Sequence, residues 1–260
     1  MQNSNILSII IVNYRSEKYL EKCLSSIYGV WGHDLEMIIV NNDVTESLQG
    51  IIEKFPAVKI IEQKENVGFG RAHNAGSKIA QGKYLLFLNP DTIVLNDAVD
   101  ILNKFEQDDG VGIIGAKLVN AEGKNQAWSV GYEITLWNIV KNKLGFLKGR
   151  NVWEATQTQE VEWTSGGSMF IRKEVFESVG GFDEKFFLYF EDMDLCKRVR
   201  NFGKKVLYFP SVQIEHVEGG SVENKNKQKN DYYASQDYYF SKHFGTIQAE
   251  LVKLLRKFFV

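Results

Sequence analysis

The stretch Asn89-Pro90-Asp91-Thr92 carries side-chain oxygens at a position suited to binding a cation. It follows the continuous apolar run 84–88, which is typical of a strand buried on both faces. Pro90 has no backbone N–H, so the strand must end there. Ligands of open α/β sheets bind at the carboxyl ends of strands, and an amide and a carboxylate there suit a divalent cation carrying phosphate oxygens. A simple turn leading into the next helix is the alternative.

Glu191 and Asp192 are the candidates for acid–base chemistry. They lie between the aromatic-rich stretch 182–190 and the helical pattern of 193–202, so we expect them at a helix N-terminus. The helix dipole alone favours acids there by about 0.3–1 kcal/mol. Alternatively, the aromatic stretch desolvates Asp192, which would raise its pKa and make it a catalytic base.

The elements that must position these side chains alternate between strand and helix. Short helices separate β-branched apolar runs through the first half of the chain, which predicts right-handed crossovers and a mainly parallel α/β sheet. Strands are expected over 7–12, 36–40, 58–61, 84–88 and 112–118, and helices over 16–27, 47–55, 71–80 and 97–107. Two further strands are expected over 206–209 and 212–216, the second of which ends at His216.

Polar residues follow three of the predicted parallel strands. They are Asn13-Tyr14, Asn41 to Asp43, and Asn89 to Thr92. Because the carboxyl ends of parallel strands share one edge, these clusters predict a nucleotide-type site. Gly68-Phe69-Gly70 is not a dinucleotide fingerprint, because the third glycine position holds His73 and the motif does not follow the first strand. A Walker A loop is absent as well.

Composition limits the class of protein. At 260 residues, the chain is expected to form one large domain, or one domain with a substantial addition. Its net charge of −2 gives no sign of nucleic-acid binding. Two cysteines, Cys23 and Cys196, predict buried free thiols in a reducing, cytoplasmic compartment. The apolar run at the N-terminus reads as a first strand and not as a signal peptide, and no run is long enough to predict a membrane span.

Two regions are harder to interpret. Residues 120–160 scatter tryptophans among lysines and glycines, which favours either a partly helical excursion over the site or an ordinary surface hairpin and helix. The tail 223–260 changes composition and ends in the basic amphipathic sequence LVKLLRKFFV. This end predicts either an interfacial helix at the inner face of the cell membrane or a helix packed on the main domain.

Taken together, the motifs resemble those of family 2 glycosyltransferases with the GT-A fold, and most closely the rhamnosyltransferase-like members that build bacterial surface polysaccharides. The similarity covers about residues 6–245. The matching stretches are SIIIVNYRS (8–16), ENVGFGRAHNAG (65–76), FLNPDT (87–92), the long segment 163–221 with WTSGGS and FEDMDLCKR, and SKHFG (241–245).

The resemblance implies inverting transfer of a sugar from a nucleotide-diphosphate donor to an acceptor hydroxyl, with Mn²⁺ or Mg²⁺. Asp91 matches the metal-binding acid of the family's two-acid motif, and Asn89 stands where the first acid usually lies. His216 matches the late metal ligand. Asp192 matches the general base, and Glu191 is the neighbouring acid and second choice.

The resemblance also assigns the substrate side chains. Asn13, Tyr14, Asn89 and Asp91 belong to the donor site, and Gly68, Arg71 and Asn74 match donor-contacting positions. Asn41 stands where an acid usually reads the nucleobase, and Asp43 is the residue that could replace it. The acceptor side is expected to include Trp163, Gly167 and Ser168.

The resemblance divides the chain into a donor half (1–118), an acceptor and catalytic half (119–222) and a C-terminal helical extension (223–260). We expect dTDP-L-rhamnose as donor before UDP-sugars, a saccharide or lipid-linked saccharide as acceptor, and possible homodimerisation. The alternatives are a nucleotidyltransferase, which lacks support because NYRSEKYL replaces the expected glycine-rich basic loop, and a non-catalytic sugar-binding protein on the same fold.

Overall fold

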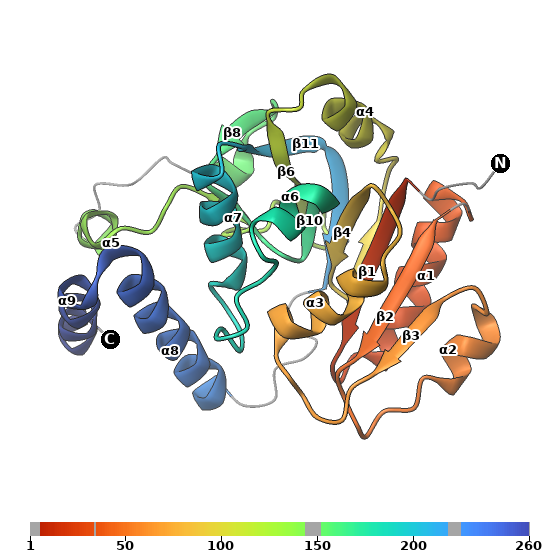
Figure 1. The fold of residues 1–260 in the computed structure, drawn as a ribbon, viewed down its shortest axis with the longest axis horizontal. Coiled ribbons are helices and arrows are strands. Elements are labelled where there is room, and N and C mark those ends of the chain that lie inside the picture. The colour runs from red at the N-terminus through yellow and green to blue at the C-terminus, as the bar shows by residue number, and fades with distance from the viewer. Residues whose placement is uncertain (1–5, 34, 144–151, 218–224, 260) are drawn as a thin grey trace.

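A mixed sheet forms the centre of the molecule (Figure 1). The computed structural model describes residues 6–33, 35–143, 152–217 and 225–259. Within them the sheet has nine strands, which are, in spatial order, β3 (Lys59–Glu62), β2 (Glu36–Asn41), β1 (Leu7–Asn13), β4 (Tyr84–Leu88), β10 (Ser168–Arg172), β6 (Val111–Val119), β11 (Lys205–His216) and β5 (Thr92–Val94), with β8 (Gln159–Val161) paired to β11.

Most strands of the sheet run in one direction. The first four pair in parallel, and β6 pairs in parallel with β11. Strand β10 lies antiparallel between β4 and β6, and β5 and β8 are antiparallel to β11. The predicted mainly parallel α/β sheet is therefore confirmed. The strand expected over 168–171 is present as β10, but its antiparallel direction was not predicted.

Helices cover both faces of the sheet. Along β1 the side chains alternate, so that Ile9 and Ile11 join one buried cluster and Ile10 and Val12 the other. The first cluster packs under α1 (Glu17–Trp31), α2 (Gln49–Lys54) and α4 (Val99–Gln107), and the second under α3 (Phe69–Ile79), α6 (Lys173–Ser178) and α7 (Glu191–Asn201). Each fully buried isoleucine contributes about 1.5–3 kcal/mol.

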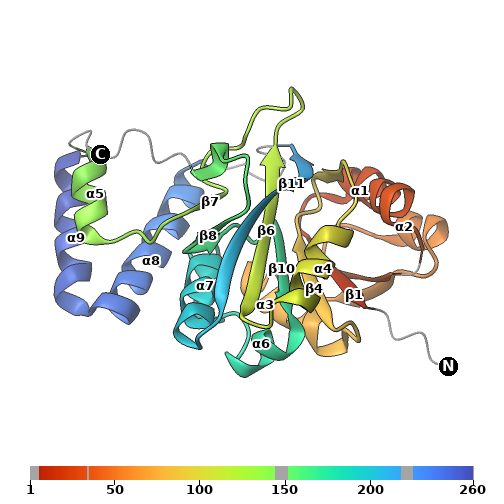
Figure 2. The ribbon, with the colours of Figure 1, turned by 90° about the horizontal axis from the view of Figure 1, so that it is seen from above.

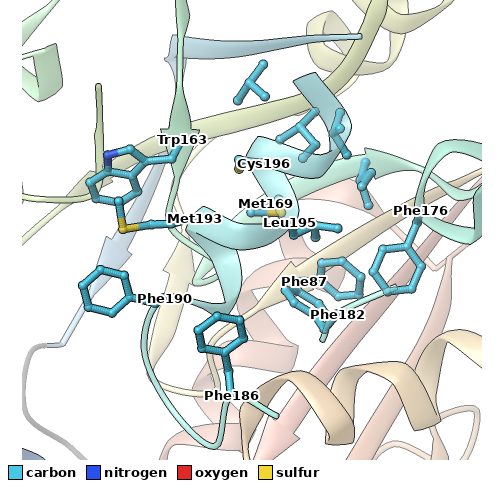
Figure 3. Close-up of a cluster of buried hydrophobic side chains, with 14 of the residues drawn as sticks. Phe87, Trp163, Met169, Phe176, Phe182, Phe186, Phe190, Met193, Leu195 and Cys196 are labelled. Carbon is cyan, nitrogen blue, oxygen red and sulfur yellow. The ribbon is translucent and has the colours of Figure 1, made fainter. Parts of the chain in front are cut away.

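The aromatic stretch before α7 is part of the core. Phe182, Phe186 and Phe190 are almost fully buried in the cluster that Figure 3 shows. Asn74 of α3 fixes this stretch, because its amide donates to the carbonyl of Phe182 and its oxygen accepts from the Phe182 N–H, both at 2.9 Å. The sequence 182–190 is therefore a pinned connection that delivers the start of α7 to the sheet.

Three local expectations were wrong. A short strand, β5, follows Asp91, where a turn into a helix was the alternative. Residues 205–216 form one strand and not two, with a register shift between Phe209 and Gln213. Gly82, which the sequence favours as the C-cap because glycine commonly ends helices, does not end α3, whose C-cap is Ala80. Gly82 instead lies against Ser8 of β1, where an added Cβ atom would approach the Ser8 backbone nitrogen to 2.6 Å.

The segment 120–160 is partly helical, as one of the two readings expected. It contains β7 (Val130–Gly131), which pairs with β9 (Trp163–Thr164), then α5 (Leu136–Lys143) and a short 3-10 turn at Val152–Glu154. Residues 144–151 lie outside the described part of the chain. Both cysteines are buried and free, as predicted, and burial raises the pKa of each thiol to about 12.

Two helices, α8 (Lys225–Phe244) and α9 (Thr246–Phe259), form the tail. They lie at one end of the molecule beside α5, opposite α1 and α2 (Figure 2). Tyr239 and Phe240 of α8 are buried in the same cluster as α7, so the tail packs on the main domain. The expected boundary at 222/223 falls outside the described residues. Within these residues, every helix is too short or too polar to cross a bilayer.

A buried carboxylate ties the tail to α7. Asp194 is fully buried and contacts Nε2 of His243 at 2.7 Å, Nζ of Lys242 at 2.6 Å and Nε of Arg198 at 2.7 Å. Burial alone would raise the pKa of Asp194, but the hydrogen bonds and positive charges around it outweigh burial and lower the pKa to about 2.

We expect Asp194→Asn to lower the free energy of unfolding by about 3–5 kcal/mol, because it leaves buried cations without their counter-charge. The wild-type carboxylate has a folded pKa below its ordinary 3.8, so it stabilises fully above about pH 4 and this contribution is lost as the pH falls toward about 2. Urea unfolding at pH 7 and in acid measures both effects. The exposed Asp100 of α4 gives the control Asp100→Asn, with a change below about 1 kcal/mol. Equal losses of unfolding free energy in the two variants would show that Asp194 does not tie the tail to α7.

Candidate active site

Asp91, Asn89 and His216 meet at the carboxyl end of β4. Strand β5 pairs antiparallel with the end of β11, which sets His216 opposite Thr92. The Nε2 atom of His216 lies 3.2 Å from Oδ1 of Asp91 and 3.1 Å from Nδ2 of Asn89. Asp91 is 7% exposed. The structure thus brings together two residues that are 125 positions apart in the sequence.

Gln126 fixes the orientation of the His216 ring. Its Oε1 atom lies 2.9 Å from Nδ1 of His216 and can only accept a hydrogen bond, so Nδ1–H is the donor. Nε2 then carries the lone pair, which accepts from the amide of Asn89 at 3.1 Å and lies 3.2 Å from the carboxylate of Asp91. Two electron-pair donors that face each other at 3.2 Å fit a cation between them, and metal-binding histidines commonly donate their other N–H in this way.

Asp91 and His216 alone would not complete the coordination of a metal ion. In the part of the chain that the structure describes, no group of three or more His, Cys, Asp and Glu side chains converges to hold a metal ion. A divalent cation held by Asp91 and His216 therefore needs further oxygens, which a diphosphate and water can supply.

The ends of β1 and β2 form the second part of the site. Nδ2 of Asn13 donates to Oδ1 of Asn41 at 3.0 Å. Nδ2 of Asn41 donates to Oε2 of Glu62 at 2.8 Å and to the carbonyl of Glu46 at 3.1 Å. The amide of Asn41 is therefore fully engaged within the protein, and its predicted contact with the base lacks a free hydrogen-bonding group.

Asp43 has the acceptor that Asn41 lacks. Its Oδ1 atom accepts from the N–H and hydroxyl of Thr45, whereas Oδ2 is buried without a hydrogen-bond partner and lies 3.9 Å from Nε of Arg15. Oδ1 of Asn13 is also buried and unpartnered. Burial raises the pKa of Asp43, but the Thr45 hydrogen bonds and the Arg15 charge lower it overall, so the group is ionised. Tyr14 directly follows the last residue of β1, and its side chain is half-exposed.

The glycine loop before α3 packs against the aromatic stretch. Gly68 has a φ of +88°, and an added Cβ atom would lie 2.5 Å from the carbonyl oxygen of Phe187. The Phe69 N–H donates to that same oxygen at 2.9 Å. Arg71 remains at the surface and pairs with Glu184 at 3.4 Å. The side chain of Asn74 is hydrogen-bonded to Phe182, so it positions the aromatic stretch and is engaged within the protein at the predicted donor contact.

Asp192 is held at the first turn of α7 by two backbone N–H groups. Gly166 donates to Oδ2 at 3.2 Å and Met193 to Oδ1 at 2.8 Å. The carboxyl group is half-buried, and burial raises its pKa despite these two hydrogen bonds. Gly166 packs between Phe69 and Asp192, where an added Cβ atom would lie 2.9 Å from the Phe69 ring.

Glu191 differs from its neighbour in environment. It is 4% exposed, and its Oε2 atom has no hydrogen-bond partner. It lies beside Gly70, whose added Cβ atom would approach both Phe182 and Glu191. Burial, together with the charge of Asp192, raises the pKa of Glu191 well above its ordinary value. The aromatic stretch therefore covers Glu191 more closely than the sequence indicated, and Asp192 is the carboxylate left accessible.

A short loop joins the two halves of the site. Gly166 holds Asp192, and the carbonyl of the next residue, Gly167, accepts from the Asn89 N–H at 3.2 Å. Ser168 is buried and donates to the carbonyl of Ala116 at 3.3 Å. Gly166 and Gln126 had not been singled out from the sequence, because nothing in their spacing signals backbone donors or partners of a histidine.

Trp163 lies in the core and not on the wall of the site. Its indole N–H donates to the carbonyl of Tyr132 at 3.0 Å, and the side chain is 7% exposed. Figure 3 shows it beside Met193 in the buried cluster. Trp163 therefore offers almost no exposed surface for the predicted contact with the acceptor.

Comparison with known families agrees with this architecture. The model of glycosyl transferase family 2 matches residues 8–180, and that of the N-terminal domain of galactosyltransferase matches residues 154–219. An N-acetylglucosaminyl-diphospho-decaprenol L-rhamnosyltransferase of Mycobacterium tuberculosis is 25% identical over 242 residues, which cover 84% of this chain and 78% of the relative. Rhamnosyltransferase WbbL of Escherichia coli is 28% identical, with 80% and 82% covered.

Solved structures establish the fold. The chain aligns with GalNAc-T7, crystallised with UDP, GalNAc and Mn²⁺, at a TM-score of 0.66 and 15% identity over 93% of this chain. It aligns with residues 1–349 of Staphylococcus aureus TarS in complex with UDP-GlcNAc at 0.62 and 18% identity over 89%. The chain spans only 51% and 64% of those two chains. They confirm the GT-A fold that the sequence predicted.

The family model covers 173 of the 260 residues, since it runs from 8 to 180, and it includes the ends of β1, β2 and β4. It favours sugar transfer over nucleotidyl transfer and over a non-catalytic role. The chain therefore belongs to glycosyl transferase family 2, is a glycosyltransferase, and is similar to the rhamnosyltransferases of that family.

Proposed function

We propose that the chain is an inverting, metal-dependent glycosyltransferase that uses a nucleotide-diphosphate sugar, with dTDP-L-rhamnose as the first candidate donor. The observation that carries the proposal is the loop Gly166-Gly167, which holds Asp192 and Asn89 through consecutive residues. Through this loop Asp192, whose pKa is raised by burial, lies near the carboxyl end of β4, where Asn89 and Asp91 suit a diphosphate with its cation. The Mycobacterium relative is an L-rhamnosyltransferase and RfbF of Shigella flexneri is a dTDP-rhamnosyl transferase, which supports rhamnose as the sugar.

In this mechanism the acceptor hydroxyl attacks the anomeric carbon while Asp192 removes its proton. A new C–O bond forms on one side of the sugar as the bond to the diphosphate breaks on the other, which inverts the configuration. Asp91 and His216 would hold Mn²⁺ or Mg²⁺, whose positive charge stabilises the leaving diphosphate. The crystallisation of GalNAc-T7 with Mn²⁺ supports this choice of ions.

The base of the donor is assigned to the ends of β1 and β2. The unpartnered acceptors of Asp43 and Asn13 suit the ring N–H of thymine or uracil, and the ring of Tyr14 offers a face for stacking. Residues 1–118 then bind the donor, 119–222 supply the base and the acceptor side, and 223–260 form a helical extension. The acceptor is a saccharide or a lipid-linked saccharide such as N-acetylglucosaminyl diphosphate on a polyprenol, after the Mycobacterium relative.

We expect Asp192→Asn to lower kcat by about 10²–10⁴-fold, because the isosteric amide cannot accept the acceptor proton. Stabilisation of the protein by dTDP with Mn²⁺ should persist, since the base does not touch the nucleotide. Turnover of dTDP-rhamnose with a short-chain N-acetylglucosaminyl-diphospho-lipid, hereafter the acceptor analogue, measures the effect. Asp100→Asn is the matched control.

The pH profile tests the same assignment. Because burial raises the pKa of Asp192, protonation should remove the base at a pH above that of an ordinary aspartate, and wild-type kcat should fall as the pH is lowered. The residual rate of Asp192→Asn should lack this limb. A variant with wild-type turnover and an unchanged acid limb would show that Asp192 is not the base.

We expect His216→Ala to raise the Mn²⁺ concentration needed for half-maximal rate by at least about tenfold, and Gln126→Ala to raise it by a smaller factor because it only orients the ring. Titration of Mn²⁺ at saturating donor measures both, with His33→Ala as the control for an exposed histidine. Unchanged metal dependence in His216→Ala would return this histidine to a packing role.

We also propose that α9 contacts the anionic inner face of the cell membrane. Ile247, Leu251 and Leu254 are 77%, 42% and 49% exposed and recur at helical spacing, whereas Ala249 and Val252 on the other side of the helix are buried. The exposed stripe lines a shallow hollow of about 370 Å³. Lys253 pairs with Glu250 of the same stripe at 2.7 Å, and the exposed Lys257 in the last turn supplies a positive charge for an anionic surface, as in interfacial helices.

We expect the double variant Leu251→Gln/Leu254→Gln to lose binding to phosphatidylglycerol vesicles in flotation, with unchanged turnover of the soluble acceptor analogue. Ile52→Gln, an exposed apolar residue of α2 at the other end of the molecule, is the control. If the double variant instead converts a dimer to a monomer in sedimentation equilibrium, the stripe is a subunit contact and the membrane proposal is wrong. Equal flotation of all three proteins would contradict it as well.

A further inference from the structure

Trp128 is a large apolar side chain held in water. It is 63% exposed, although tryptophan is highly buried on average. Its backbone φ is 61°, in the left-handed region that bulky residues rarely occupy and that persists only where the surroundings impose it. A costly backbone conformation that holds an indole in solvent indicates that the indole binds a ligand.

Two hydrogen bonds fix Trp128 between the two chemical parts of the site. Two residues before it, the Gln126 side chain binds Nδ1 of His216 at 2.9 Å. One residue after it, the carbonyl of Ser129 accepts from the Ser165 N–H at 2.8 Å. Ser165 directly precedes Gly166, which holds Asp192. The backbone around Trp128 is thus tethered at one end to the proposed metal ligand and at the other to the loop of the proposed base.

Trp153 provides a second ring beside the first. The ring centroids of Trp128 and Trp153 lie 5.3 Å apart, with 42° between the planes. Trp153 is half-buried, and its carbonyl accepts from the hydroxyl of Tyr208, a residue that is fully buried in the core. One ring is therefore anchored to the sheet, and the other extends from it into solvent.

We propose that Trp128, supported by Trp153, is the platform on which a sugar ring of the acceptor saccharide stacks. One face of a pyranose ring presents C–H groups, which pack on the electron-rich face of an indole while the ring hydroxyls stay hydrated. The acceptor must reach Asp192, and Trp128 is tethered to the loop that holds Asp192. The donor base belongs at the other end of the rim, at β1 and β2. This subsite rests on the proposed function, because it defines the saccharide that the base deprotonates.

Steady-state kinetics of the full chain, with dTDP-rhamnose, Mn²⁺ and the acceptor analogue, test the platform. We expect Trp128→Ala to raise KM for the acceptor analogue by about tenfold, with donor KM unchanged. Trp128→Tyr should restore most of the affinity, because it keeps an aromatic face. Trp137→Ala is the matched control, since Trp137 is similarly exposed, at 64%, but lies on α5 beside the tail helices. Thermal unfolding verifies that each variant is folded.

Binding is measured separately from turnover. The acceptor analogue should quench tryptophan fluorescence of the wild type and of Trp137→Ala, and should quench Trp128→Ala much less. If no donor is turned over but this quenching pattern is seen, the saccharide site stands and the proposed transfer reaction fails. Equal acceptor KM and equal quenching in Trp128→Ala and Trp137→Ala would overturn the platform, and so would a rise in donor KM with acceptor KM unchanged.

Discussion

The hydrogen bonds of the loop Gly166-Gly167 are the constraint on which the site depends. One residue donates to the carboxylate of Asp192, and the next accepts from the backbone of Asn89. Helix α7, which carries the proposed base, and strand β4, which ends at the proposed metal ligand Asp91, are thereby fixed to one short loop. Both positions are crowded, since an added Cβ atom would lie 2.9 Å from Phe69 at Gly166 and 3.0 Å from Nδ2 of Asn89 at Gly167. Glycine allows the backbone to approach both partners closely.

The proposed base Asp192 needs a fixed α7, and the tail helps to hold that helix in place. Asp194 lies two residues after Asp192 and is bound by His243 and Lys242 of α8. Tyr239 adds a buried ring to the cluster that packs under α7. Because a buried carboxylate without its cations is costly, α8 is part of the framework of the base and not a detachable addition. The outward stripe of α9 is then left available for another surface.

The sequence predicted the parts of the fold that depend on local pattern. Buried apolar runs located β1 to β4. The polar residues that follow β1, β2 and β4 indicated the proposed site at the carboxyl ends of these strands. It did not predict the antiparallel direction of β10, because a strand buried on both faces has the same composition in either direction. It also misplaced Trp163, since nothing local distinguishes a buried indole from an exposed one. Gln126 and Trp128 lie in the segment with the weakest periodicity, and tertiary contacts alone give them their positions.

The replacement of an acid by Asn89 changes how charge is balanced at the proposed metal site. The carboxylate of Asp91 supplies one negative charge, whereas His216 would supply only a nitrogen lone pair. A divalent cation bound to both would therefore keep a net charge of about +1. A second carboxylate would hold the free cation more tightly, but its negative charge would also lie close to the diphosphate and repel it. If Asp91 and His216 hold the cation as proposed, the single carboxylate would favour binding of cation and diphosphate together. The product diphosphate would then carry the counter-charge that the protein lacks, which would couple release of the nucleotide to release of the metal.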